Sequence, residues 1–249
     1  KISPSKRLIL MIIFLFFSIH FLPVKIFNVD IPFLIPLLQN NIFSSIFVLL
    51  CFLFIINGAN LIDGFNGLLV IHLIIINSIL LYLNISSENN EFSILLIAQL
   101  IILLAFLLFN FPNARIFLGD SGSYVMGSLV ALNSIITNNL NPNYSSFFFC
   151  ILLFYLFFEV FFSFLRKIMQ KKSPIRPDNK HLHMLVFEKI SLKYGKKNGN
   201  YINSIIINLI FSVCVFPALY FAKDPVLSRY WFFSLIVIYL FIYYRLYHL

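Results

Sequence analysis

Long runs of apolar residues, separated by short polar stretches, recur along the whole chain. Each run approaches the roughly 17–25 residues that a helix needs to cross the hydrocarbon core of a bilayer. Because a backbone in lipid must satisfy its own hydrogen bonds, we expect these runs to be helices. The pattern predicts an all-α, polytopic integral membrane protein with about eight transmembrane helices, over residues 8–23, 42–57, 67–83, 93–110, 121–137, 146–166, 201–221 and 230–248.

The composition agrees with this class. Hydrophobic residues make up 61% of the chain and charged residues only 11%, whereas ordinary soluble domains carry about a quarter charged residues. The apolar runs leave no room for a separate soluble domain. We therefore interpret residues 1–249 as a single transmembrane domain.

The formal net charge of +9 is distributed unevenly between the expected loops. With eight spans and both chain ends on one side, 15 of the 18 Lys and Arg residues fall on that side, and ten of them lie between Arg166 and Lys197. This asymmetry is the positive-inside pattern of cytoplasmic loops. It predicts that both ends and a basic loop over residues 166–200 are cytoplasmic, and it explains the charge without nucleic-acid binding.

Three polar side chains mark the end of the second expected span. Asn57, Asn60 and Asp63 recur every three residues, so they line one face of the last helical turns. Such a face presents two amides and a carboxylate to a single ligand. The alternative is that these Asn and Gly residues only cap the helix and turn the chain.

A second polar run, Gly119-Asp120-Ser121-Gly122-Ser123, opens directly into the fifth expected span. We expect Asp120 or Ser121 to cap this helix, whose free N–H groups favour an anion. Asp120 also suits Mg²⁺ bound to a diphosphate, because Mg²⁺ prefers one or two carboxylates together with phosphate oxygens. A glycine-rich capped turn without a ligand is the alternative, since the lysine of a P-loop is missing.

The third polar stretch, Arg176-Pro-Asp178-x-x-His181-Leu-His183, lies in the basic segment. The His-x-His spacing allows a metal, but no Cys or further His is near in sequence to complete a zinc site. In so basic a segment, His and Arg fit contacts with phosphate oxygens better. Solvated residues without a role are the alternative.

The three polar stretches are expected on one membrane face. Together they offer a cation site, a helix start that binds anions, and basic groups, a combination that favours phosphoryl transfer. The chain resembles the polyprenyl-phosphate N-acetylhexosamine-1-phosphate transferases, the MraY/WecA type of glycosyltransferase family 4. Three motifs carry the resemblance: Asn57-x-x-Asn60-x-x-Asp63-Gly-x-Asn66-Gly, Phe117-x-Gly119-Asp120-Ser121-Gly122-Ser123 and Arg176-Pro-Asp178-x-x-His181-Leu-His183.

The resemblance implies a reaction, a cofactor and a location. A sugar 1-phosphate would pass from a UDP-N-acetylhexosamine, such as UDP-N-acetylglucosamine, to undecaprenyl or another polyprenyl phosphate, with release of UMP. The lipid-linked product would initiate O-antigen or other cell-envelope polysaccharide synthesis. The resemblance implies Mg²⁺, with Mn²⁺ as a substitute, and a bacterial cytoplasmic membrane with the catalytic loops on the cytoplasmic face. It leaves a homodimer open.

The resemblance also implies roles for individual residues. The expected catalytic residues are Asp63, Asp120, His181 and His183, and Asp120 is also the expected metal ligand. The expected substrate-binding residues are polar or aromatic members of the three motifs, namely Asn57, Asn60, Asn66, Phe117, Ser121 and Arg176.

The chain departs from the family pattern in several places. Relatives carry three further helices, about eleven in all, and an adjacent Asp-Asp pair before the point that corresponds to Lys1, so we expect an N-terminally truncated sequence. Asn66 stands where Asp is frequent. Met184 replaces a third histidine, which favours the sugar-antigen branch. Glu159 lies inside a span where relatives often have an acid, and we expect it to pair with a neighbouring helix or with Arg166.

Two other interpretations remain open. The missing Asp-Asp pair allows a truncated or inactive relative. The many apolar helices allow a transporter or flippase, although transporter sites lie near the bilayer midplane, whereas the polar clusters of this chain lie at the ends of the expected spans.

Overall fold

The computed structural model describes residues 3–22, 24–174, 176 and 178–248; Lys1, Pro23 and Pro177, which belong to the expected segments and motifs, lie outside the described residues. This part of the chain forms ten α-helices and no β-strand, which confirms the all-α class. The helices are α1 (Pro4–Phe21), α2 (Leu34–Leu38), α3 (Asn41–Ile62), α4 (Leu68–Ser86), α5 (Asn90–Asn110), α6 (Gly119–Leu140), α7 (Ser146–Leu152), α8 (Phe154–Met169), α9 (Leu182–Tyr220) and α10 (Pro225–Tyr247).

Each expected span corresponds to a helix or to a pair of helices. The run 146–166 is divided into α7 and α8, which meet at an angle of 75°. In the described chain, five helices (α3, α4, α5, α9 and α10) are long and apolar enough to cross a membrane, or six if α7 and α8 form one bent span. The protein is thus a multi-pass membrane protein, but the expected count of eight spans is not reached.

Two helices account for the difference. The C-terminal half of α6 carries a series of polar residues that make it less apolar than an ordinary span, among them Asn133, Ser134, Thr137, Asn138 and Asn139. α1 has 18 residues and carries two basic side chains, Lys6 and Arg7, in its first turn.

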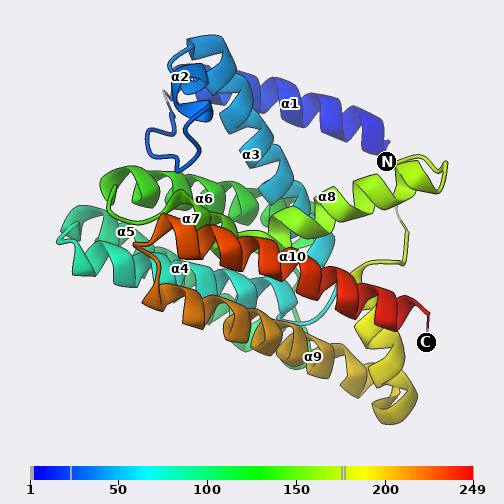
Figure 1. The fold of residues 1–249 in the computed structure, drawn as a ribbon. Helices are drawn as coiled ribbons and strands as arrows, with labels where there is room; N and C mark the ends of the chain where they lie inside the picture. The colour runs from blue at the N-terminus through cyan, green and yellow to red at the C-terminus, as the bar shows by residue number, and fades with distance from the viewer. Residues whose placement is uncertain (1–2, 23, 175, 177, 249) are drawn as a thin grey trace.

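Helix α3 has a central place in the fold and contacts α1, α6 and α8 (Figure 1). Its packing against α8 depends on Gly58. A Cβ atom at this position would lie 2.7 Å from the carbonyl carbon of Leu156 and 2.9 Å from its Cα, closer than atoms in van der Waals contact. The glycine therefore lets the backbones of α3 and α8 meet directly.

Polar side chains join α4, α5 and α6 inside the bundle. The buried amide of Asn133 in α6 donates hydrogen bonds to Asn77 Oδ1 of α4 over 3.0 Å and to Gln99 Oε1 of α5 over 2.7 Å. One residue thereby ties three helices together, as polar side chains do in membrane bundles. At least this polar residue of α6 thus serves helix packing.

The expected basic loop over residues 166–200 is largely helical. Helix α8 continues to Met169, and α9 already begins at Leu182, with a break at Gly195, whose φ of 74° suits glycine. The helical start of α9 forms because Leu182 and Leu185 are buried in the core. Figure 1 places the start of α9, drawn in yellow, on the same side of the view as both chain ends.

Candidate active site

The first two motifs meet where α3 ends and α6 begins. The side-chain amide of Asn60 donates hydrogen bonds to Asp120 Oδ1 over 3.2 Å and to Ser123 Oγ over 2.9 Å. Ser123 is buried and donates its own hydroxyl to the backbone oxygen of Asp120 over 3.1 Å. The two motifs, expected on one face, therefore form a single polar site.

Two carboxylates share this site. Asp120 is 61% exposed, and its Oδ2 forms an ion pair with Nη1 of Arg7 from α1. Asp63 follows the last residue of α3 and is half-buried. Burial, and to a smaller extent the negative charge of Asp120, raises the pKa of Asp63 from 3.8 to about 7. The site therefore gathers negative charge that a cation would relieve.

The segment that follows Asp63 is fixed by amide side chains. Asn110, at the end of α5, accepts a hydrogen bond from Gly67 N over 2.7 Å and donates one to Ile116 O over 2.8 Å. Asn66 donates to Pro112 O over 2.8 Å. Gly67 precedes α4 with a φ of 76°, which explains the glycine at this turn. Asn66 thus supports the loop, and Asn110 is a supporting residue that sequence reasoning missed.

Three other expected substrate-binding residues of these two motifs are Asn57, Phe117 and Ser121, and their environments differ. The side-chain amide of Asn57 donates a hydrogen bond to Leu53 O over 2.7 Å, so this N–H is bonded within α3 itself. Phe117 is 74% exposed, and Ser121 is exposed as well. The expected cap of α6 by Asp120 or Ser121 is wrong. The helix begins at Gly119, so both residues lie in its first turn. The N-cap residue is Leu118, whose apolar side chain makes no hydrogen bond to the free N–H groups.

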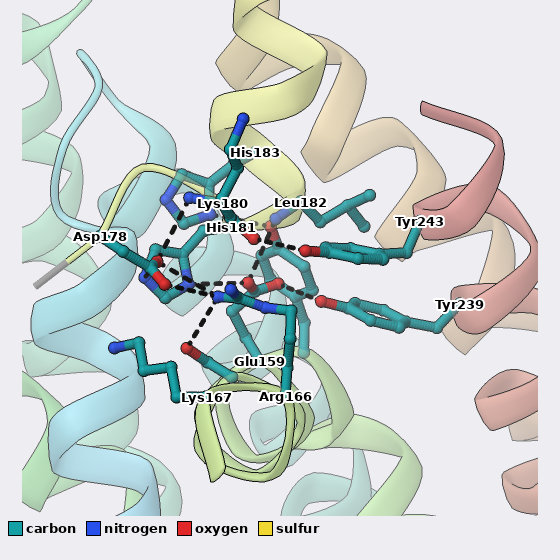
Figure 2. Close-up of polar contacts among 12 residues, drawn as sticks. Glu159, Arg166, Lys167, Asp178, Lys180, His181, Leu182, His183, Tyr239 and Tyr243 are labelled. Carbon is teal, nitrogen blue, oxygen red and sulfur yellow. Dashed lines mark hydrogen bonds and ion pairs between the residues drawn. The ribbon is translucent and has the colours of Figure 1, made fainter. Parts of the chain in front are cut away.

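The two histidines of the third motif are buried, which contradicts the interpretation as solvated loop residues (Figure 2). Their rings are parallel, with centroids 5.7 Å apart. His181 Nδ1 lies 3.0 Å from Glu159 Oε1, so Glu159 pairs with the segment before α9 and not with Arg166. His183 Nδ1 lies 3.1 Å from the hydroxyl of Tyr155 in α8.

Arg166 instead bonds to Asp178. Its Nη2 donates to both carboxylate oxygens of Asp178, over 2.9 Å and 3.2 Å. Burial raises the pKa of Asp178, but the hydrogen bond from Arg166 and the backbone N–H of Lys180 outweigh it and hold the pKa below its usual value. Arg176 has an exposed side chain, and its backbone oxygen accepts from Lys167 Nζ over 2.8 Å.

The histidines reach the carboxylate loop through Phe65. Its ring lies 5.8 Å, centroid to centroid, from that of His183 and 4.9 Å from that of Phe187. The backbone N–H of Asn66 donates to Asn200 of α9 over 2.7 Å. All three motifs are thus joined by direct contacts, although the described residues contain no group of three His, Cys, Asp or Glu side chains arranged to hold a metal ion.

Comparison with known proteins identifies the family of this chain. The family model described as glycosyl transferase family 4 matches residues 1–138. The match contains both carboxylate motifs and ends before the histidines. With residues 1–138 of 249, the match covers more than half of the chain.

Two relatives carry informative names. An undecaprenyl-phosphate alpha-N-acetylglucosaminyl 1-phosphate transferase of Thermotoga maritima is 33% identical over 147 residues, which are 58% of this chain and 44% of the relative. A phospho-N-acetylmuramoyl-pentapeptide-transferase of Streptococcus uberis is 33% identical over 138 residues, which are 54% of this chain and 40% of the relative. The matched part spans less than half the length of either relative.

Proposed function

Because this chain belongs to glycosyl transferase family 4, we propose that the protein transfers an N-acetylhexosamine 1-phosphate from a UDP-sugar to a polyprenyl phosphate. The observation that carries the proposal is the meeting of Asp63, Asp120 and Asn60 from two separate motifs at one polar site. The names of both relatives describe phospho-sugar transferases, which supports the same reaction class.

The donor set fits a divalent cation. Magnesium prefers one or two carboxylates and completes its shell with water and phosphate oxygens, and the charge of Asp120 already contributes to the raised pKa of Asp63. In this proposal Asp120 would hold Mg²⁺ or Mn²⁺, with Asp63 beside it. The ion, when bound, would neutralise negative charge on the diphosphate. Arg7 would have to exchange its ion pair with Asp120 for one with a phosphate.

The reaction itself is a displacement at phosphorus. An oxygen of the acceptor phosphate attacks the phosphorus atom that carries the sugar, and a new P–O bond forms. The bond between that phosphorus and the bridging oxygen breaks, and this oxygen leaves with its electron pair on UMP. Asn60 holds the carboxylate of Asp120 in place, His183 faces the phosphates, and the exposed ring of Phe117 offers a face for the uracil.

The proposed location follows from charge and substrate. The UDP-sugar is a soluble donor and the polyprenyl phosphate is a membrane lipid, so the site must lie at a membrane surface. The basic residues near the start of α9 favour the cytoplasmic face of a bacterial membrane. The proposed product would initiate a cell-envelope polysaccharide such as an O-antigen, and a homodimer is compatible with this scheme.

The test is direct detection of the lipid product. Protein expressed from its complete gene is reconstituted into liposomes with undecaprenyl phosphate, UDP-N-acetylglucosamine and Mg²⁺, and the lipid extract is analysed by mass spectrometry. We expect a lipid diphosphate N-acetylhexosamine, absent when the acceptor is omitted. Absence of product with UDP-N-acetylglucosamine and with the other UDP-N-acetylhexosamines would reject transferase activity and favour an inactive relative.

A further inference from the structure

Both ring nitrogens of His181 are engaged by carboxylates. Nδ1 lies 3.0 Å from Glu159 Oε1, and Nε2 lies 3.4 Å from Asp178 Oδ1. The histidine is itself buried. This geometry presents neither nitrogen to a ligand, so it suits a residue that supports the site better than one that touches substrate.

Glu159 is fully bonded in turn. Its Oε1 also accepts the backbone N–H of Leu182 over 3.1 Å, and its Oε2 accepts the hydroxyl of Tyr239 over 2.7 Å (Figure 2). The side chain is only 1% exposed. A buried carboxylate is costly unless it is paired and hydrogen-bonded. Glu159 therefore joins three elements at one point: α8, the start of α9 and α10.

Unlike His181, His183 has one ring nitrogen that is not engaged. Its Nδ1 lies 3.1 Å from the hydroxyl of Tyr155, but its Nε2 is buried and has no hydrogen-bond partner among the residues that the structure describes. An unpaired buried polar atom is expensive, and a ligand oxygen would satisfy it. The rings of His181 and His183 are parallel, with centroids 5.7 Å apart. Glu159 also binds the backbone N–H of Leu182, the residue between the two histidines, so a change at Glu159 acts on the segment that carries both.

The geometry points to two different roles in this network. Glu159 and Tyr239 are positioning residues that fix His181, and His181 in turn holds His183 so that its Nε2 meets a phosphate oxygen of the substrate. The inference rests on the proposed function and deepens it, because it makes α10 a part of the catalytic apparatus. All of these residues lie beyond the stretch 1–138 that the family model matches.

The chain offers a matched pair of variants. Tyr239→Phe removes the hydroxyl that binds Glu159. Tyr243→Phe removes a hydroxyl one helical turn further along α10, which donates to Lys180 O over 2.9 Å. Both tyrosines are buried, and both bond to groups in the same region of the site. The two variants therefore differ in their effect on Glu159, while the loss of one buried hydroxyl is common to both.

We expect Tyr239→Phe to lower kcat roughly 10- to 100-fold, the cost of a lost hydrogen bond to a charged group, with the KM for the UDP-sugar nearly unchanged. Tyr243→Phe should retain kcat within a few-fold. Glu159→Gln should resemble Tyr239→Phe, and Glu159→Ala should be worse. If Tyr239 had only a structural role, both tyrosine variants would show lower yield and lower thermal stability. The kcat of the folded enzyme would then be the same in Tyr239→Phe and Tyr243→Phe.

A second readout does not depend on activity. Nitrogen-15 NMR of histidine-labelled protein in bilayers resolves the imidazole nitrogens, and loss of a signal in His181→Asn assigns that residue. Tyr239→Phe should shift the His181 signal, while Tyr243→Phe should leave it in place. Lack of any product with the wild-type protein would reject the proposed function. The comparison of His181 signals between the two tyrosine variants would still show whether Tyr239 positions His181. An unchanged His181 signal in Tyr239→Phe, or an equal shift in both variants, would overturn the inference.

Discussion

The side-chain amide of Asn60 donates a hydrogen bond to Asp120 Oδ1 over 3.2 Å, although the two residues are separated by 60 positions in the chain. The same amide also holds Ser123 Oγ at 2.9 Å. Because Asn60 belongs to α3 and Asp120 to α6, one side chain joins the ends of two helices. The orientation of the Asp120 carboxylate thus depends on both motifs at once.

Asp120→Asn should abolish turnover while the protein still inserts into the membrane. The asparagine keeps the size of the side chain and an oxygen that can accept from Asn60, but it loses the charge that would hold a cation. Charge stabilisation by a metal ion is worth several kcal/mol, so the rate should fall about 100-fold or more. Initial rates over a range of Mg²⁺ concentrations measure this. A rate near that of the wild type at ordinary Mg²⁺ would exclude Asp120 as the ligand.

Asp63 should make the protein less stable as the pH rises. Its pKa in the folded state is about 7, above the usual 3.8, so the folded protein binds more protons than the unfolded chain between these values. The stability that the protonated group contributes is present below pH 4 and is lost as the pH passes 7.

Asp63→Asn, which cannot ionise, should therefore unfold at a higher temperature than the wild type at pH 8 and at a similar temperature near pH 4. Thermal unfolding in detergent at several pH values checks this. A difference between the two proteins that does not change with pH would show that the charge of Asp63 is not the cause. The expected gain in stability comes with loss of turnover, because the carboxylate serves the site.

Gly58→Ala should destabilise the contact between α3 and α8. The added methyl group would lie 2.7 Å from the carbonyl carbon of Leu156, a backbone atom that cannot rotate away, and overpacking of this kind costs about 1–3 kcal/mol. Gly64→Ala is the matched control, because a Cβ atom there meets no atom within 4 Å. Comparable melting temperatures for the two variants would contradict the close packing.

Asn133→Ala should weaken the bundle by leaving Asn77 and Gln99 without their donor. Hydrogen bonds between membrane helices contribute about 0.6 kcal/mol on average and up to about 1.7, so we expect a modest fall in melting temperature. Asn143→Ala removes an exposed amide and serves as the control. A double-mutant cycle between Asn133 and Gln99 that gave no coupling would contradict a direct contribution to stability.

The meeting of the first two motifs could be predicted from the sequence, because polar side chains stand out against apolar spans. Asn60, Asp63 and Asp120 are conspicuous at the ends of such runs, and their spacing places them on helix ends. The environment of the histidines could not be predicted in this way. His181 and His183 lie in a very basic segment, yet both are buried. Their partners Glu159 and Tyr155 lie 22 and 28 positions earlier, in the apolar helix α8, and no local pattern indicates these contacts.

Tyr239 and the bend between α7 and α8 were missed for different reasons. A tyrosine in an apolar run resembles any other aromatic residue, and its partner Glu159 lies 80 positions away. The run 146–166 contains no Gly or Pro, the usual signals of a kink. The sequence therefore carries no local signal for the bend of 75°.

The most direct test of the account is the release of UMP by the reconstituted protein expressed from its complete gene. A coupled assay would follow UMP from a UDP-N-acetylhexosamine with and without polyprenyl phosphate, and with Mg²⁺ either present or removed by chelation. The account predicts UMP release only when both the lipid acceptor and the divalent cation are present, and its loss in Asp120→Asn. UMP release that continued after chelation, or no release under any condition, would contradict it.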